Sequence, residues 1–164
     1  MNAEPRARLA ARQAELIRAL YGGPPVTGLD AQMVALTSAA LAHKRARAVA
    51  RAWPALALEL GTDFAGRFTA YALASPPPDG GALADGLPFS QALAREGNPP
   101  GNARIEHMLT TTRVKLRHNR LITRRSPRLA ATITGRPRQL AIVVSLPPIG
   151  TRLLTLGPLT RRRP

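Results

Sequence analysis

The apolar residues of this chain follow two different spacings, and the change between them near residue 110 limits the folds that the chain can adopt. Before that point they recur every three or four residues, which is the period of an amphipathic helix. Beyond it they alternate or form short runs, over 129–133, 140–146 and 152–156, which is typical of strands. The sequence therefore predicts an α+β protein, in which a bundle of four to six short helices is followed by a small antiparallel β-meander.

Capping residues, glycines and prolines mark the helix ends in the first hundred residues. Phe64, Phe68 and Tyr71 recur at i, i+4 and i+7, so they are expected to anchor the core. Trp53 is interpreted as a packed core aromatic after a helix end. The predicted helices cover residues 4–21, a segment from an Asp30 N-cap to near Trp53, a short helix from Pro54 to Gly61, a helix capped by Thr62 or Asp63, and a short helix over Pro88–Arg95.

Turn residues and composition divide the chain into four predicted segments. All six aromatic residues precede residue 90, so the large core is expected in the helical part. In the meander, turns are expected at Gly135–Arg138 and Pro147–Gly150, with one face on the helices and the other in water. The segments are a helical domain over 1–97, a basic linker over 98–127 with a short helix capped by Asn102 and a strand, the β-meander over 128–157, and a basic tail over 158–164.

The positive charge is concentrated in the C-terminal third. The formal net charge is +15, with 10 Lys+Arg against 8 Asp+Glu in residues 1–100 and 14 against 1 in residues 101–164, so the two parts carry about +2 and +13. If residues 113–117 form a strand, Arg113, Lys115 and Arg117 share one side of it. The candidate anion-binding or peptide-binding residues are Arg113, Lys115, Arg117, Arg120, Arg124, Arg125, Arg136 and Arg138.

Several anionic ligands would suit such a surface. Guanidinium groups bind phosphates, a carboxylate-rich peptide or an acidic protein face, and a plain solvated basic face is the alternative. Residues 101–164 contain no Phe, Tyr or Trp, so stacking on single-stranded nucleic acid is not expected. Sequence-nonspecific binding of duplex phosphates remains open, although no helix-turn-helix is evident.

The motifs of catalysis and metal binding are absent from the sequence. There is no cysteine, the three histidines have no metal-ligand spacing, and no nucleophile elbow or phosphate-binding glycine loop occurs. Glu59 and Asp63 are interpreted as a solvated carboxylate and an N-cap, and Asp79 and Asp85 as turn residues. We therefore expect no catalytic site, metal or cofactor. Charged residues interrupt the N-terminal segment, which is neither a signal peptide nor a membrane span, so a cytoplasmic protein is expected.

Part of the N-terminal text resembles a known family. The resemblance covers roughly residues 9–97, and its most specific pieces are Lys44–Arg47 leading to Ala52–Pro54, Leu60–Gly61 with Phe64 and Phe68, and the PPPDGG…ADG stretch from Pro76 to Gly86. It is similar to a small actinobacterial domain that is fused behind, or encoded beside, a multinuclear non-haem iron-dependent oxidative enzyme that modifies ribosomally made peptides.

This resemblance implies an accessory role. Such domains dock on the iron enzyme and help to present the precursor peptide, whereas the iron ligands and the chemistry belong to the enzyme chain. Lys44, Arg47 and Arg51 match the family text and share one helix face at i, i+3 and i+7, which is either a partner-docking ridge or the solvated side of the bundle. A nucleic-acid-binding module and a purely structural interaction domain are the alternative functions.

Overall fold

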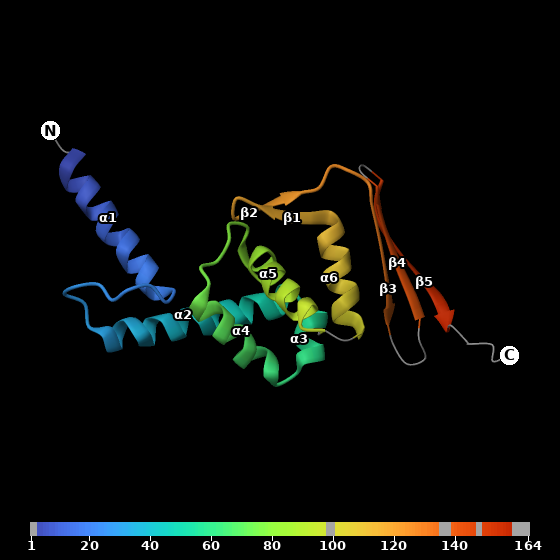
Figure 1. Cartoon of the computed structure of the whole chain (residues 1–164), viewed down its shortest axis with the longest axis horizontal. Coiled ribbons are helices and arrows are strands. Elements are labelled where there is room, and N and C mark those ends of the chain that lie inside the picture. Colours follow the sequence, from blue (N-terminus) through green and yellow to red (C-terminus); the bar gives the residue numbers. More distant parts are fainter. Residues whose placement is uncertain (1–2, 98–100, 135–138, 147–148, 159–164) are drawn as a thin grey trace.

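The computed structural model describes residues 3–97, 101–134, 139–146 and 149–158. Within them, helices precede strands, which confirms the predicted α+β class (Figure 1). The described elements are α1 (Ala3–Leu20), α2 (Ala31–Ala52), α3 (Pro54–Leu60), α4 (Asp63–Ala74), α5 (Gly81–Arg95), α6 (Gly101–Arg113), β1 (Val114–Arg117), β2 (Arg120–Thr123), β3 (Arg128–Thr134), β4 (Gln139–Leu146) and β5 (Gly150–Pro158).

The ends of α2 and α3 follow local sequence signals. Asp30 precedes α2, and its Oδ1 accepts hydrogen bonds from the backbone N–H groups of Gln32 and Met33 at 2.8 and 3.4 Å. Pro54 begins α3, where its missing N–H costs nothing, and Gly61 ends it with a φ of 54°. These predicted boundaries are therefore confirmed.

The main core lies among α2, α3, α4 and α5. Trp53, Phe68 and Leu87 are completely buried in it. Phe68 packs edge-on against Phe89 with 5.1 Å between ring centroids, and Tyr71 contacts both rings. The predicted aromatic stripe thus anchors the core, and Trp53 is a packed core residue.

Helix α5 is longer than the sequence predicts. Its expected start was Pro88, because proline breaks a helix interior, yet α5 begins at Gly81 and carries Pro88 inside it. Burial explains the difference: Ala84 and Leu87 have no exposed surface, and the Cα of Gly86 lies so close to the Trp53 indole that a Cβ would overlap it. Packing against α2 and Trp53 therefore outweighs the local cost of the proline.

An ion pair buried between α2 and α5 corrects a further prediction. Asp85 was expected in a turn, but it lies inside α5 and pairs with Arg45, and the side chains of Arg45 and Asp85 are only 12% and 5% exposed. Arg45 Nε and Nη2 donate to the two carboxylate oxygens of Asp85 at 2.9 and 2.8 Å. Arg45 Nη1 also donates to the carbonyl groups of Ala72 and Ser75 at the end of α4, so this pair joins three helices.

Helices α3 and α6 cap each other. Glu106 of α6 accepts hydrogen bonds from the N–H groups of Ala55 and Leu56 at 3.2 and 2.8 Å, in the first turn of α3. Glu59 of α3 accepts one at 3.0 Å from the N–H of Asn102, in the first turn of α6. Glu59 is thus a capping group rather than the solvated carboxylate that was predicted, and Asn102 lies inside the helix that it was expected to cap.

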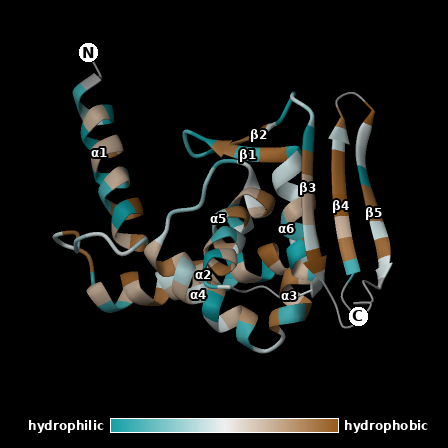
Figure 2. Cartoon of the chain, turned by 45° about the vertical axis from the view of Figure 1, so that its right-hand side comes forward, coloured by the Kyte–Doolittle hydropathy of each residue, from teal (hydrophilic) through white to brown (hydrophobic). Residues whose placement is uncertain are grey.

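The strands form two antiparallel sheets among the described residues. β1 and β2 make a hairpin, and β3, β4 and β5 form the predicted meander in that order. Figures 1 and 2 both show α6 between the bundle and the three-stranded sheet. Met108 of α6 packs there on Ala141 and Val143 of β4, as a small second core. Helix α6 therefore packs on both the bundle and the sheet, and the division of the chain near residue 97 stays a prediction.

We predict that Asp85→Ala lowers the free energy of unfolding by about 3–5 kcal/mol, because it leaves the Arg45 guanidinium buried without its carboxylate. Urea unfolding at neutral pH measures the loss. The double variant Arg45→Met/Asp85→Leu should recover most of it, since it removes both charges together. A loss below about 1 kcal/mol in Asp85→Ala would show that the pair is not held in the buried geometry described here.

Candidate functional site

The basic hairpin is fixed to the helical part at Asp79. Its turn residues, His118 and Asn119, have φ values of 48° and 61°, which fits a two-residue hairpin turn. The backbone N–H of Asp79 donates to the carbonyl of Asn119 at 2.7 Å, and the N–H of Leu121 donates to the carbonyl of Asp79 at 2.8 Å. Leu116 and Leu121 pair across the strands and pack against the main core.

Successive residues of the hairpin strands alternate between two faces, and this alternation decides where the cations lie. Lys115 pairs with Ile122, and Arg117 with Arg120, so these four residues occupy the face opposite Leu116 and Leu121. The predicted common side of Lys115 and Arg117 is therefore present. Arg113 is the last residue of α6 and does not belong to the strand, which corrects the predicted three-residue stripe.

Arg124 is the best-fixed cation of the C-terminal part. Its Nε donates to the carbonyl groups of Thr111 at 2.8 Å and Val114 at 3.3 Å, and its backbone N–H donates to the carbonyl of Arg113 at 2.8 Å. These bonds hold the side chain against the end of α6. Desolvation, and secondarily the nearby Arg128 guanidinium, lower the pKa of Arg124 from its ordinary value.

Arg124 lines a cavity of about 570 Å³, which we call the basic cavity. The other residues around it are Lys115, Ile122, Thr123, Arg125, Ser126 and Arg128. Four of the seven carry a positive charge. None of the ion pairs found among the described residues involves any of these four. An anion with several oxygens would therefore relieve like-charge repulsion in this cavity.

The structure brings together some of the predicted anion-binding residues and separates others. Lys115, Arg124 and Arg125 meet at the basic cavity, together with Arg128, which is not among the predicted anion-binding residues. Arg113 lines a smaller hollow of about 160 Å³, which shares Thr123 and Arg124 with the basic cavity. Arg117 and Arg120 lie at the hairpin tip, and Arg136 and Arg138 fall outside the described residues. Arg128 was missed because it begins a separate strand whose position depends on tertiary packing.

A second candidate surface runs along α2. Seven of its exposed residues fall on one side of the helix at the 3.6-residue period, and we call them the α2 face: Met33, Leu36, Ala40, His43, Lys44, Arg47 and Arg51. The N-terminal end of this face is apolar and its C-terminal end is basic. Phe64 and Ala65 of α4 form a groove of about 470 Å³ with its middle part. The predicted ridge of Lys44, Arg47 and Arg51 is thus exposed and continues into apolar surface.

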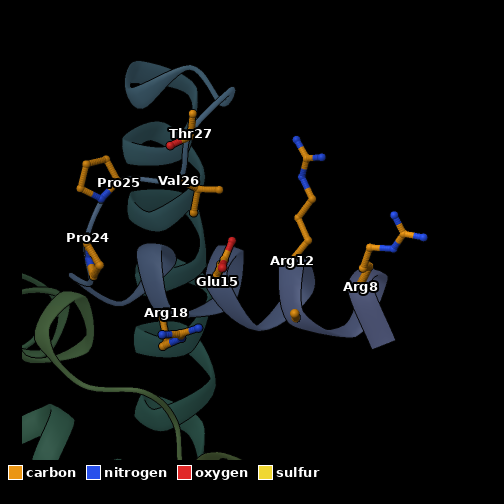
Figure 3. A pocket seen from close by; sticks show the side chains of 9 residues that line it. Arg8, Arg12, Glu15, Arg18, Pro24, Pro25, Val26 and Thr27 are labelled. Carbon is orange, nitrogen blue, oxygen red and sulfur yellow. The ribbon is translucent and has the colours of Figure 1, made fainter. Parts of the chain in front are cut away.

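Helix α1 projects from the bundle and forms a third cleft with residues 24–27 (Figure 1). Its volume is about 620 Å³. Figure 3 shows Arg12 and Glu15 rising from one side of α1, whereas Arg18 does not extend in their direction. Arg8, also in this cleft, lies 3.7 Å from Glu4. The charges here are mixed, so this cleft concentrates positive charge less than the basic cavity does.

A serine and a histidine are in contact in the interior, but their geometry is structural. Ser90 Oγ lies 3.0 Å from His107 Nδ1 and donates its hydrogen to the carbonyl of Leu87 at 2.8 Å. With the hydroxyl hydrogen on the Leu87 carbonyl, the contact with Nδ1 requires the histidine tautomer that carries its proton on Nδ1. Ser90 is also completely buried. Among the described residues, no three His, Asp or Glu side chains are placed to hold a metal ion.

Comparison with known proteins identifies the helical part. A model of the SCO6045-like C-terminal domain family matches residues 10–95, just over half of the chain. The chain belongs to this family. A UPF0276 protein of Streptomyces avermitilis is 39% identical over 95 residues, which are 57% of this chain and 19% of that protein. The chain therefore spans about a fifth of this relative's length, and no solved structure matches it.

The family match agrees in extent with the resemblance noted in the sequence and supports an actinobacterial domain. The matched segment, residues 10–95, contains the α2 face and ends before α6. The basic cavity therefore lies outside the matched segment. The described helices include none with the length and hydrophobicity that crossing a bilayer requires.

We predict that acidification destabilises the protein through His107. Burial lowers the pKa of this residue below its ordinary 6.5, so the unfolded chain binds a proton more readily than the folded one. Stability should therefore be full above pH 6.5 and fall as the pH drops from 6.5 toward the folded-state pKa. Urea midpoints at pH 7.5 and 5.5 test this. His107→Gln keeps a donor toward Ser90 and should lose less stability over that range; an equal loss would contradict the assignment.

Proposed function

We propose that this chain is a non-enzymatic accessory protein that holds a precursor peptide for a multinuclear non-haem iron oxidative enzyme. The observation that carries the proposal is the division between the family segment and the basic cavity. The family segment is helical and bears the α2 face, whereas the cavity lies beyond it. We assign enzyme docking to the first and peptide binding to the second.

The size of the relative supports a domain that works beside a larger one. The matched 95 residues are 19% of the Streptomyces avermitilis protein, so that chain has about 500 residues, from 95 divided by 0.19. In that relative, the matched domain is covalently joined to roughly 400 further residues of the same chain. The enzyme that this domain serves would be a neighbour of that kind, and the iron and the oxidative step would belong to that enzyme.

The C-terminal part has two features that suit an acidic peptide. β3 and β5 are the edge strands of the meander, and an edge strand can pair with an added peptide strand through main-chain hydrogen bonds. β3 begins at Arg128, which also lines the basic cavity. A peptide paired with β3 would therefore place one end beside four cations, which would select carboxylates at that end.

Co-purification tests enzyme docking. We predict that the full chain, co-expressed with a multinuclear non-haem iron enzyme of the same organism, co-purifies with it at micromolar concentration. The triple variant Lys44→Glu/Arg47→Glu/Arg51→Glu should weaken this binding about tenfold or more, because it reverses three exposed charges on the α2 face. Arg6→Glu/Arg8→Glu/Arg12→Glu on α1 is the matched control. Absence of co-purification contradicts the proposed function.

Peptide binding is tested at the basic cavity. We predict that Lys115→Glu/Arg125→Glu/Arg128→Glu lowers the affinity for a fluorescent peptide of alternating Glu and Val by about tenfold or more, since it replaces attraction by repulsion. Fluorescence anisotropy at 150 mM salt measures the effect. Arg124 is left unchanged because its hydrogen bonds fix the end of α6. An unchanged affinity would show that the cavity is only a solvated basic surface.

The same assay distinguishes the alternative, a sequence-nonspecific nucleic-acid-binding module. Its support is the group of four cations at the cavity without a carboxylate partner among the described residues. Duplex DNA would then bind with an affinity that falls steeply with salt, with a log–log slope of roughly −3 to −4 if four phosphates are contacted. Tight, steeply salt-dependent DNA binding that the acidic peptide does not compete with would favour this alternative.

A further inference from the structure

We propose that the face of the three-stranded sheet turned away from α6, which we call the outer sheet face, is a second docking surface for the partner enzyme. Its occupant would be a protein surface with an apolar centre and a rim of carboxylates. This inference rests on the proposed function and adds to it a contact outside the family segment. Three observations carry it: the strand register, the exposure of large apolar side chains, and the sign of the surrounding charge.

The register of the meander assigns each residue to one of two faces. Ala141, Val143 and Ser145 of β4 are buried on the side of α6. Residues that pair directly across antiparallel strands share a face, and neighbours along a strand alternate. The outer sheet face therefore consists of Leu129, Ala131 and Ile133 of β3, Leu140, Ile142 and Val144 of β4, and Arg152, Leu154 and Leu156 of β5.

The larger apolar side chains lie on the open side of the sheet. Leu129, Leu154 and Leu156 are 72%, 55% and 53% exposed, whereas the residues of β4 that face α6 are small. Apolar colour dominates β4 and much of β3 in Figure 2. An antiparallel sheet with one face in water normally has polar residues on that face. A contiguous apolar face of this kind indicates a surface that is covered in the functional assembly.

The charge of the surrounding residues decides which partner covers the outer sheet face. Arg152 lies on the outer sheet face itself, and the sequence after Glu106 contains 13 Lys+Arg but no Asp or Glu. Every charged side chain that this part of the chain offers to a docking protein is therefore positive. A second copy would bring the same cations, with a net charge of +15 on each chain. An acidic partner gains attraction from the same groups.

The dimensions of the face also disfavour a second copy. Three strands about 4.8 Å apart, with eight residues rising about 3.3 Å each, give a footprint of roughly 14 by 26 Å. A stable dimer usually buries about 800 Å² on each partner, so this face alone is small for one. A larger enzyme can extend over the face and the nearby basic side chains together.

The strand β5 provides a matched pair of variants for the experiment. Leu154→Ser/Leu156→Ser changes the outer sheet face, and Leu153→Ser changes the same strand on the α6 side, where Leu153 is 41% exposed. Thermal unfolding checks that both variants fold. Affinity for the iron enzyme used in the co-purification is measured by biolayer interferometry at 50 and 300 mM salt. We expect the double variant to bind at least about tenfold more weakly and Leu153→Ser less than about twofold more weakly.

Each outcome decides the proposal. Weaker binding by the double variant alone, with wild-type affinity that falls as salt rises, supports it. Equal affinities overturn this inference and leave the proposed function intact, whereas a wild-type chain that binds no enzyme overturns both. Sedimentation of the isolated chain tests whether a second copy of the chain covers the face. A wild-type dimer that dissociates in the double variant would show that it does, and would overturn the enzyme contact.

Discussion

The Arg45–Asp85 pair is the contact on which the packing of the helical part depends. Two charges with so little exposure are tolerated only when their polar atoms are paired. Here the carboxylate takes two guanidinium donors, and the third nitrogen binds the carbonyl groups of Ala72 and Ser75, so the end of α4 is fixed against α2 and α5. Trp53 packs on Gly86 at the same helix crossing, which requires the glycine. The distant sequence pieces that carried the family resemblance therefore meet in one place.

Helix α6 transfers this rigid arrangement to the C-terminal strands. Glu59 of α3 binds the first turn of α6, Glu106 of α6 binds the first turn of α3, and Met108 packs on β4 in the second core. Arg124 is bonded to the carbonyl groups at the end of the same helix, so the basic cavity is positioned by the helical part and not only by its own loop. A peptide bound at the cavity and an enzyme bound at the α2 face would therefore be held at a fixed distance and orientation to each other, which suits the accessory role proposed above.

The distribution of carboxylates is the basis for our proposal that the C-terminal part binds an external anion. Eight of the nine Asp and Glu residues precede residue 97, and the ninth, Glu106, caps α3. The cations around the basic cavity thus have no acidic residue near them in sequence. The outer sheet face adds apolar area beside this charge. Apolar contact supplies most of the binding free energy in such a surface, whereas the guanidinium groups select the sign of the partner and speed its approach.

The sequence by itself determined the features that depend on local physics. Asp30 and Gly61 fixed helix ends through capping and backbone conformation, the Phe64–Phe68–Tyr71 spacing predicted the core stripe, and alternation after residue 128 predicted the meander. Only the tertiary structure decided the roles of Arg45, Asp85 and Glu59, the start of α5 and the grouping of Arg128 with Lys115. Each of these depends on contacts between segments far apart in the chain, where burial and long-range hydrogen bonds outweigh the local preference of a charged residue for water or of proline for a helix end.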